Sequence, residues 1–124
     1  MIQDPYSRLV REYFSSPAHA GELDSGVTVS MEEQDVRLKL FGIEQDGEIQ
    51  RLRFQVWGCP HVIAACEYVC RSYEGEPLKS LASLRAADIM QILPVPVEKT
   101  GRILVLEDAA RMLGQRLSGD SAPR

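Results

Sequence analysis

The residue best suited to do chemistry in this sequence is Cys59, which stands between Gly58 and Pro60 after an alternating apolar run. Proline fits the first position of a helix because its missing N–H has no partner to lose there, so we expect a helix directly after Cys59. At a helix N-terminus the free N–H groups and the positive end of the dipole favour the thiolate, which binds metals and carries sulfur. The sequence therefore offers Cys59 as a metal ligand or reactive thiol, with a small buried packing residue as the alternative.

Four other residues carry side chains that bind metals, and each has a structural alternative. Asp35 is a candidate second ligand, because adjacent strands and the turn before the helix can bring it near Cys59; the alternative is a carboxylate at a turn or strand edge. His61 is expected to be exposed at the helix start, because neighbouring helical residues point in different directions and share a metal poorly. Cys66 and Cys70 have the i, i+4 spacing of a chelating pair, but their helix is apolar and we expect both in the core.

The composition is typical of a globular protein and argues against nucleic-acid and membrane proteins. The 124 residues suit one domain, 44% of them are hydrophobic, and the formal net charge is −4. A nucleic-acid-binding surface needs a basic face, and no apolar run approaches the roughly 20 residues that span a bilayer. The N-terminus lacks the features of a signal peptide, and 3 cysteines do not make a disulfide framework, so we expect a cytoplasmic protein.

Hydrophobic periodicity predicts the elements that position these residues. Asp4-Pro5 and an apolar face from Tyr6 to Phe14 predict a first helix, with Pro5 at its first position. Alternating residues then predict three strands, a hairpin turn between the second and third strands, and one bulge in the third strand. The first strand is expected to begin at Val27, and the second and third strands to cover 35–43 and 49–56. The turn is Asp46-Gly47, and the bulge lies near Gln50-Arg51.

The second half of the chain has helical patterns over 61–73, 78–81, 86–93 and 102–117. A helix, three strands and then further helices predict an α+β fold, with helices packed on one face of a three-stranded antiparallel sheet. We expect one domain over residues 1–117 and a flexible C-terminal tail over 118–124.

Several short segments, taken in their order and spacing, carry a resemblance to a known family. They are Tyr6-Ser7 through Gly21, Asp35-Val36, Asp46-Gly47, Gly58-Cys59, Ile63-Ala64-Ala65, Asp88-Ile89 and Leu106-Glu107-Asp108-Ala109. Together they resemble the iron–sulfur cluster assembly scaffolds of the IscU/NifU N-terminal type, over nearly the whole domain. The resemblance implies the same α+β fold and a scaffold rather than an enzyme.

The resemblance also implies a site for the cluster. The family binds its nascent cluster with three cysteines, an aspartate and a histidine; here Cys59 matches the middle cysteine and Asp35 matches the aspartate. Glu33-Gln34-Asp35 stands where the family has Cys-Gly-Asp, and Thr100-Gly101-Arg102 stands where it has His-Cys. Two family cysteines and the histidine are therefore absent, although clusters are usually held by four ligands that are mostly thiolates.

Three functions stay open on the sequence. The first is a scaffold-like protein in iron–sulfur cluster assembly, which binds iron or a labile 2Fe–2S cluster through Cys59 and Asp35, with further ligands from a second chain in a homodimer. The second is an adaptor that binds no metal and uses the scaffold's shape to bind a cysteine desulfurase or other assembly proteins. The third and least favoured is a thiol enzyme with Cys59 as nucleophile, for which the sequence supplies no convincing base.

Overall fold

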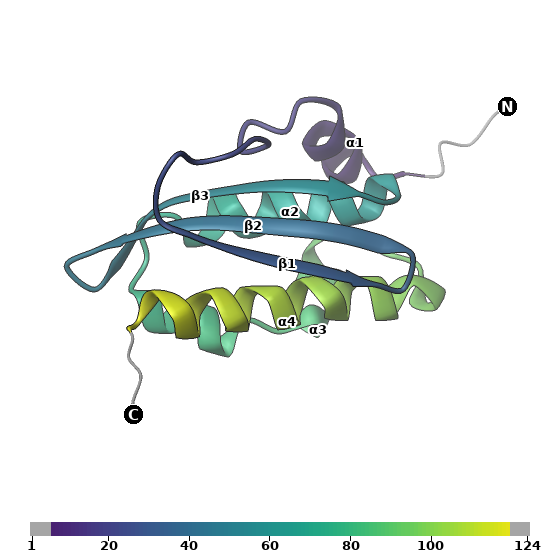
Figure 1. Ribbon diagram of the computed structural model, residues 1–124. Helices are drawn as coiled ribbons and strands as arrows, with labels where there is room; N and C mark the ends of the chain where they lie inside the picture. Colours follow the sequence, from purple (N-terminus) through teal and green to yellow (C-terminus); the bar gives the residue numbers. More distant parts are fainter. Residues whose placement is uncertain (1–5, 120–124) are drawn as a thin grey trace, which may run out of the picture.

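A three-stranded antiparallel sheet forms one layer of the protein, and helices form the other (Figure 1). The computed structural model describes residues 6–119. The strands are β1 (Val27–Glu33), β2 (Val36–Gln45) and β3 (Glu48–Trp57), and β2 lies between the other two. The α+β fold predicted from the sequence is confirmed.

Two tight turns connect the three strands. Gln34 and Asp35 join β1 to β2 with φ values of 53° and 61°, and Asp46 and Gly47 join β2 to β3 with φ values of 55° and 81°. Positive φ at both central residues is the turn geometry that matches the twist of paired strands. The hairpin predicted at Asp46-Gly47 is therefore confirmed, and a second hairpin of the same kind places Asp35 at its tip.

A bulge in β3 keeps its apolar residues on the face that meets the helices. The pairing of β2 with β3 skips Gln50, because Glu44 pairs with Ile49 while the residue before Glu44 pairs with Arg51. The extra residue lets Ile49 and Leu52 both lie in the core although three positions separate them. The bulge predicted near Gln50-Arg51 is confirmed.

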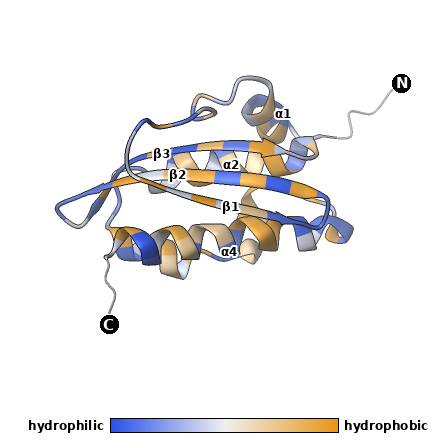
Figure 2. Cartoon of the chain, in the orientation of Figure 1, coloured by the Kyte–Doolittle hydropathy of each residue, from blue (hydrophilic) through white to orange (hydrophobic). Residues whose placement is uncertain are grey.

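The helices pack on one face of the sheet (Figure 1). Helix α2 (Pro60–Tyr73) packs against β3, α4 (Thr100–Leu117) packs against β1 and β2, and α1 (Arg8–Ser15) packs against α2. Hydrophilic and hydrophobic residues alternate along the strands in Figure 2, so one face of the sheet joins the helices in a single core. The connections between α2 and α4 contain the 3-10 helix η1 (Leu78–Ser83), α3 (Ala86–Ile92) and the 3-10 helix η2 (Val97–Lys99).

The first helix begins later than the sequence predicts. Ser7 is the N-cap residue, its Oγ accepts a hydrogen bond of 3.1 Å from the backbone N–H of Val10, and α1 starts at Arg8. A serine oxygen satisfies an N–H group that has no partner within the helix, so the helix starts at this cap and the predicted start at Pro5 is wrong. Asp4 and Pro5 themselves lie outside the described residues.

The end of the last helix agrees with the predicted end of the domain. Helix α4 ends at Leu117, and the part of the predicted tail beyond Gly119 lies outside the described residues. The single domain and its flexible tail stay predictions. Within residues 6–119, no helix is both long enough and apolar enough to cross a lipid bilayer.

A buried ionic network ties the loop after α1 to α2 and β3. Glu67 of α2 is fully buried, and its Oε2 lies 2.8 Å from Nδ1 of His19 and 2.7 Å from Nε of Arg71. The other ring nitrogen of His19 lies 3.1 Å from Oε1 of Glu74, whose second oxygen accepts a hydrogen bond of 2.9 Å from Arg53. The backbone of His19 also pairs with β3, so the network holds this loop along the edge of the sheet.

Candidate functional site

Cys59 lies at the end of the sheet, immediately before a helix, as the sequence predicts. Strand β3 ends at Trp57, Cys59 is the N-cap residue of α2 with extended backbone angles, and Pro60 occupies the first helical turn. The thiol is half-buried and forms no close capping hydrogen bond to the helix. Its sulfur therefore stays available to a ligand beside the positive end of the helix dipole.

The surroundings of Cys59 favour its thiolate. Burial raises the pKa of the Cys59 thiol, but four neighbouring groups lower it by more than burial raises it, so the net shift is downward. These groups are the backbone N–H of Val62, the Arg102 side chain, the charge of Lys99 and the backbone N–H of His61. A thiol with a lowered pKa is more often ionised near neutral pH, and the thiolate is the form that reacts and binds metals. The site therefore places a thiol with a lowered pKa next to two cationic side chains.

The other two cysteines have the opposite environment. Cys66 and Cys70 are fully buried in α2 among apolar side chains. Burial and the charge of Glu67 raise the pKa of both thiols well above the ordinary value. Both are therefore packing residues in the structure, as their apolar helix predicts, and Cys59 is the accessible thiol of the three.

Asp35 lies at the same end of the sheet as Cys59. Arg37 pairs with Trp57 at the end of the β2–β3 ladder, and Asp35 and Cys59 each stand two residues beyond that pair. The carboxylate is exposed at the tip of the β1–β2 turn. The structure thus brings the two predicted site residues to the same end of the sheet. The strand register that does this was already indicated by the sequence pattern.

The start of α4 completes this end of the molecule. A Cβ atom at Gly101 would lie 3.0 Å from the side-chain oxygen of Gln34, so the β1–β2 turn touches the first turn of α4. In Figure 1 this turn, the arrowhead of β3 and the start of α4 lie at the same right-hand end. Three segments that are far apart in the sequence therefore lie at the end of the sheet where β3 leads into Cys59.

The donor atoms at this edge do not form a complete metal site. Within residues 6–119, no three His, Cys, Asp or Glu side chains are grouped closely enough to hold a metal ion. Cys59 supplies one thiolate and Asp35 one carboxylate, whereas the side chains of Lys99 and Arg102 bring positive charge to the sulfur. A four-ligand cluster would need further thiolates from outside this chain.

His61 is buried, so the prediction that it is exposed at the helix start is wrong. Its exposed fraction is 4%, and its ring lies 4.9 Å from the ring of Tyr6, centroid to centroid. Neither ring nitrogen has a hydrogen-bond partner among the described residues, and burial together with the charge of Lys99 lowers the pKa of His61. The reason is tertiary, because the ring of Tyr6, which precedes α1, lies against a side chain that the helix alone would leave in solvent.

Lys99 and Arg102 are the site residues that the sequence analysis did not identify. They lie about one helical turn apart, at the end of η2 and the beginning of α4, and both act on the Cys59 sulfur. No spacing pattern connects them with a cysteine some forty residues earlier in the chain. The sequence marked this segment as part of the site only because Thr100-Gly101-Arg102 stands at the position where the family has His-Cys.

Comparison with known proteins agrees with this fold and with the resemblance seen in the sequence. A family model described as the NifU-like N terminal domain matches residues 5–113. The iron-sulfur cluster assembly scaffold protein IscU of Escherichia coli K12 is 26% identical over 113 residues, which cover 86% of this chain and 88% of that protein. The mitochondrial iron sulfur cluster assembly protein 1 of Schizosaccharomyces pombe is 24% identical over 119 residues, covering 86% of this chain and 59% of that protein.

Solved structures show the same fold. The N-terminal part of a NifU-like protein from Brucella abortus superposes with a TM-score of 0.75 at 13% sequence identity, and the match covers 93% of this chain and 95% of that one. At this level of identity the similarity establishes the architecture and leaves the chemistry to the residues of the site.

Proposed function

The chain belongs to the NifU-like N-terminal domain family, and on that basis we propose that it acts in iron–sulfur cluster assembly as a scaffold-like protein. Its cargo is iron or a labile 2Fe–2S cluster, and the ligand that this chain contributes is the Cys59 thiolate, with Asp35 as a second donor. The observation that carries the proposal is the half-buried Cys59 sulfur at the N-terminus of α2, where its pKa is lowered. The similarity to the iron-sulfur cluster assembly scaffold protein IscU of Escherichia coli supports it.

The incomplete donor set determines what kind of binding to expect. One thiolate and one carboxylate satisfy only part of a cluster's usual four ligands, and soft iron–sulfide chemistry favours sulfur donors over oxygen. The remaining ligands must come from a second copy of the chain or from a small thiol. A cluster held in this way exchanges its outer ligands readily and is lost on dilution.

A metal-free adaptor is the second candidate, and the two cations beside Cys59 favour it. Lys99 and Arg102 stabilise a thiolate without a metal, and their charges oppose a second cation at the same sulfur. Such an adaptor would use the fold to bind a cysteine desulfurase or other assembly proteins. A thiol enzyme stays the least favoured function, because the groups that act on Cys59 are backbone N–H groups and cationic side chains, which are hydrogen-bond donors and not general bases.

Anaerobic reconstitution with ferrous iron and sulfide tests the proposal. We expect the wild-type protein to develop the visible absorption of a cluster in the presence of a small thiol and to lose it on desalting. Cys59→Ser should abolish the absorption, because a serine oxygen is a harder and far less acidic donor. Cys66→Ala is the matched control, since Cys66 is buried in the core and should not touch the cargo.

Two results would redirect the assignment. A cluster that survives desalting and is unchanged in Cys59→Ser would show that the ligands lie elsewhere in the chain. If the wild-type protein binds no iron under any condition, the adaptor becomes the better function. A pull-down with a cysteine desulfurase then tests that function directly, using the same protein without metal.

A further inference from the structure

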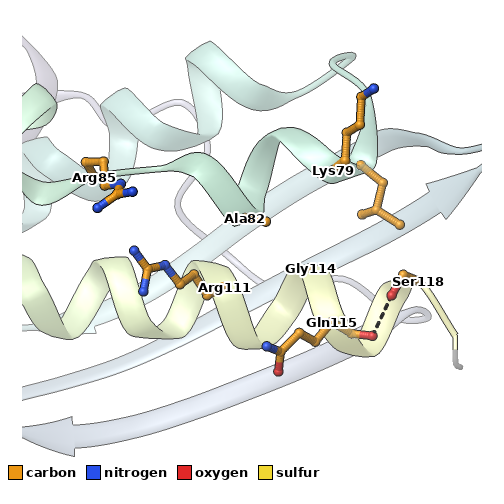
Figure 3. Close-up of a pocket in the computed structure, with 8 residues that line it drawn as sticks. Lys79, Ala82, Arg85, Arg111, Gly114, Gln115 and Ser118 are labelled. Atoms are coloured by element: carbon orange, nitrogen blue, oxygen red, sulfur yellow. Dashed lines mark hydrogen bonds between the residues drawn. The ribbon is translucent and has the colours of Figure 1, made fainter. Parts of the chain in front are cut away.

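A pocket of about 750 Å³ lies away from Cys59, between η1 and the C-terminal half of α4 (Figure 3). Leu78 and Ala82 of η1 line one wall, and Gly114 of α4 lies on the opposite wall. A Cβ atom at position 114 would come within 3.1 Å of Leu81, so the glycine lets the two helices approach closely here. The volume falls within the range of about 300–1,000 Å³ that small-molecule sites usually occupy.

The charge of the lining is opposite to the charge of the chain. Of its eight residues, Lys79, Arg85 and Arg111 are cationic and none is acidic, although the chain has 18 acidic residues and only 14 Lys and Arg. Neither Lys79 nor Arg85 forms an ion pair with any residue in the range 6–119. The pocket therefore concentrates positive charge, and the charges of Lys79 and Arg85 are not paired within the described residues.

One carboxylate organises the arginine end of the pocket. Oε1 of Glu107 accepts a hydrogen bond of 2.7 Å from the backbone N–H of Ala86, which fixes the start of α3 directly after Arg85. Oε2 of the same carboxylate lies 3.2 Å from the Arg111 guanidinium. Figure 3 shows Arg85 and Arg111 at the same end of the pocket, away from Lys79 and Ser118. Glu107 thus pairs with the Arg111 guanidinium and fixes the backbone beside Arg85, while the Arg85 guanidinium has no carboxylate partner among the described residues.

The hydrogen-bonding capacity of Arg111 is also incompletely used. Its Nε is buried and has no acceptor among the described residues, and its contact with Glu107 uses a different nitrogen. Like charges placed at one end of a pocket repel each other, and an anion between them removes the repulsion while accepting hydrogen bonds from the guanidinium N–H groups that line the pocket. The arrangement is therefore suited to receive oxygen atoms that carry negative charge.

We propose that this pocket binds a small organic anion, whose phosphate or carboxylate oxygens are held by Arg85 and Arg111. Planar guanidinium groups bind both kinds of oxyanion through pairs of N–H donors. The apolar part of the ligand lies along Ala82 and Leu78, towards the end of the pocket where Lys79 stands. This site is separate from the proposed cargo site and does not depend on it.

Titration of the isotope-labelled protein by NMR tests the site, with pyrophosphate in one arm and citrate in the other at constant ionic strength. We expect saturable shifts of the backbone amides of Ala82, Arg85 and Gly114 in at least one arm, and the arm that responds identifies the phosphate or the carboxylate class. Arg85→Gln should weaken binding about tenfold, because it removes charge-assisted hydrogen bonds without breaking an ion pair of the folded protein.

Arg51→Gln is the control, because it removes an exposed cation on β3 that does not line the pocket. It should leave the binding constant unchanged. Arg111→Gln gives an independent second variant with the same expected direction as Arg85→Gln. The proposal is overturned if neither anion gives saturable shifts at these amides, or if Arg85→Gln and Arg51→Gln weaken binding equally, since charge alone would then account for it.

Discussion

Arg102, in the first turn of α4, lowers the pKa of Cys59, the N-cap residue of α2. Arg102 stands in the segment that takes the place of the family's His-Cys in the sequence. A cation therefore occupies a region where the family resemblance implies ligands. The same interaction stabilises the Cys59 thiolate and opposes a metal ion at it, so it bears on both candidate functions.

Removing this cation should make Cys59 less acidic. In Arg102→Ala we expect the pKa of Cys59 to rise, because the thiolate loses a nearby positive charge and hydrogen-bond donor. The pH dependence of alkylation by iodoacetamide measures the shift as a displacement of the rate profile to higher pH. Arg116→Ala, near the other end of α4, is the control and should leave the profile in place. An unchanged profile in Arg102→Ala would mean that Arg102 does not stabilise the thiolate.

The three cysteines should differ strongly in reactivity. Alkylation of the folded protein should modify Cys59 first and leave Cys66 and Cys70 unmodified, because both are fully buried and burial raises the pKa of their thiols. Mass spectrometry of peptides after brief labelling measures the order. In denaturant all three should react at similar rates, and equal labelling without denaturant would contradict the assignment of Cys66 and Cys70 to the core.

Asp35 should influence the cargo less than Cys59 does. In the reconstitution described above, Asp35→Ala should weaken or alter the cluster absorption without abolishing it, because a carboxylate is a poorer iron–sulfide ligand than a thiolate. Asp46→Ala, in the other hairpin turn, has a similar positive φ and controls for strain at the turn. If Asp35→Ala matched the complete loss expected of Cys59→Ser, the two ligands would be of equal importance and the ranking would be wrong.

The buried carboxylate of Glu67 should be important for stability. In Glu67→Gln we expect the free energy of unfolding to fall by about 2–4 kcal/mol, because His19 and Arg71 lose the carboxylate that they share in a buried network. Urea denaturation followed by circular dichroism measures the loss. Glu48→Gln, an exposed site at the start of β3, should change stability by less than about 0.5 kcal/mol. Equal effects of the two substitutions would show that the network adds nothing specific.

Glu74 should contribute to the acid sensitivity of the protein. Burial raises the pKa of Glu74, but hydrogen bonds from the Leu52 N–H, His19 and Arg53 lower it by more than burial raises it. The folded pKa of Glu74 therefore lies below its unfolded pKa. A carboxylate of this kind stabilises the fold above its unfolded pKa of about 4.3, and the stability is lost as pH falls through the folded pKa. The urea midpoint of the wild type should therefore decrease below about pH 4.3 more steeply than that of Glu74→Gln. Parallel curves for the two proteins would contradict this, and Glu48→Gln should follow the wild type.

Much of the fold could be predicted because local patterns dominate it. The positive-φ turn at Asp46-Gly47, the bulge at Gln50 and the helix after Cys59 were all indicated by short stretches of sequence, since turn chemistry and side-chain alternation act over a few residues. The start of α1 was placed wrongly because Asp4-Pro5 and Ser7 are both acceptable helix starts. The sequence pattern alone does not rank two such caps within three residues of each other.

The sequence by itself therefore determined the α+β class, the place of Cys59 at a strand–helix junction and the shared sheet edge of Cys59 and Asp35. Only the tertiary structure decided which side chains surround that thiol. His61 packs against Tyr6, Arg102 arrives at Cys59 from α4, and His19 reaches the buried Glu67 from a loop 48 residues earlier in the chain. The physical reason is that burial and Coulomb interactions depend on distance in space, and the packing of whole elements sets that distance after local propensities have formed them.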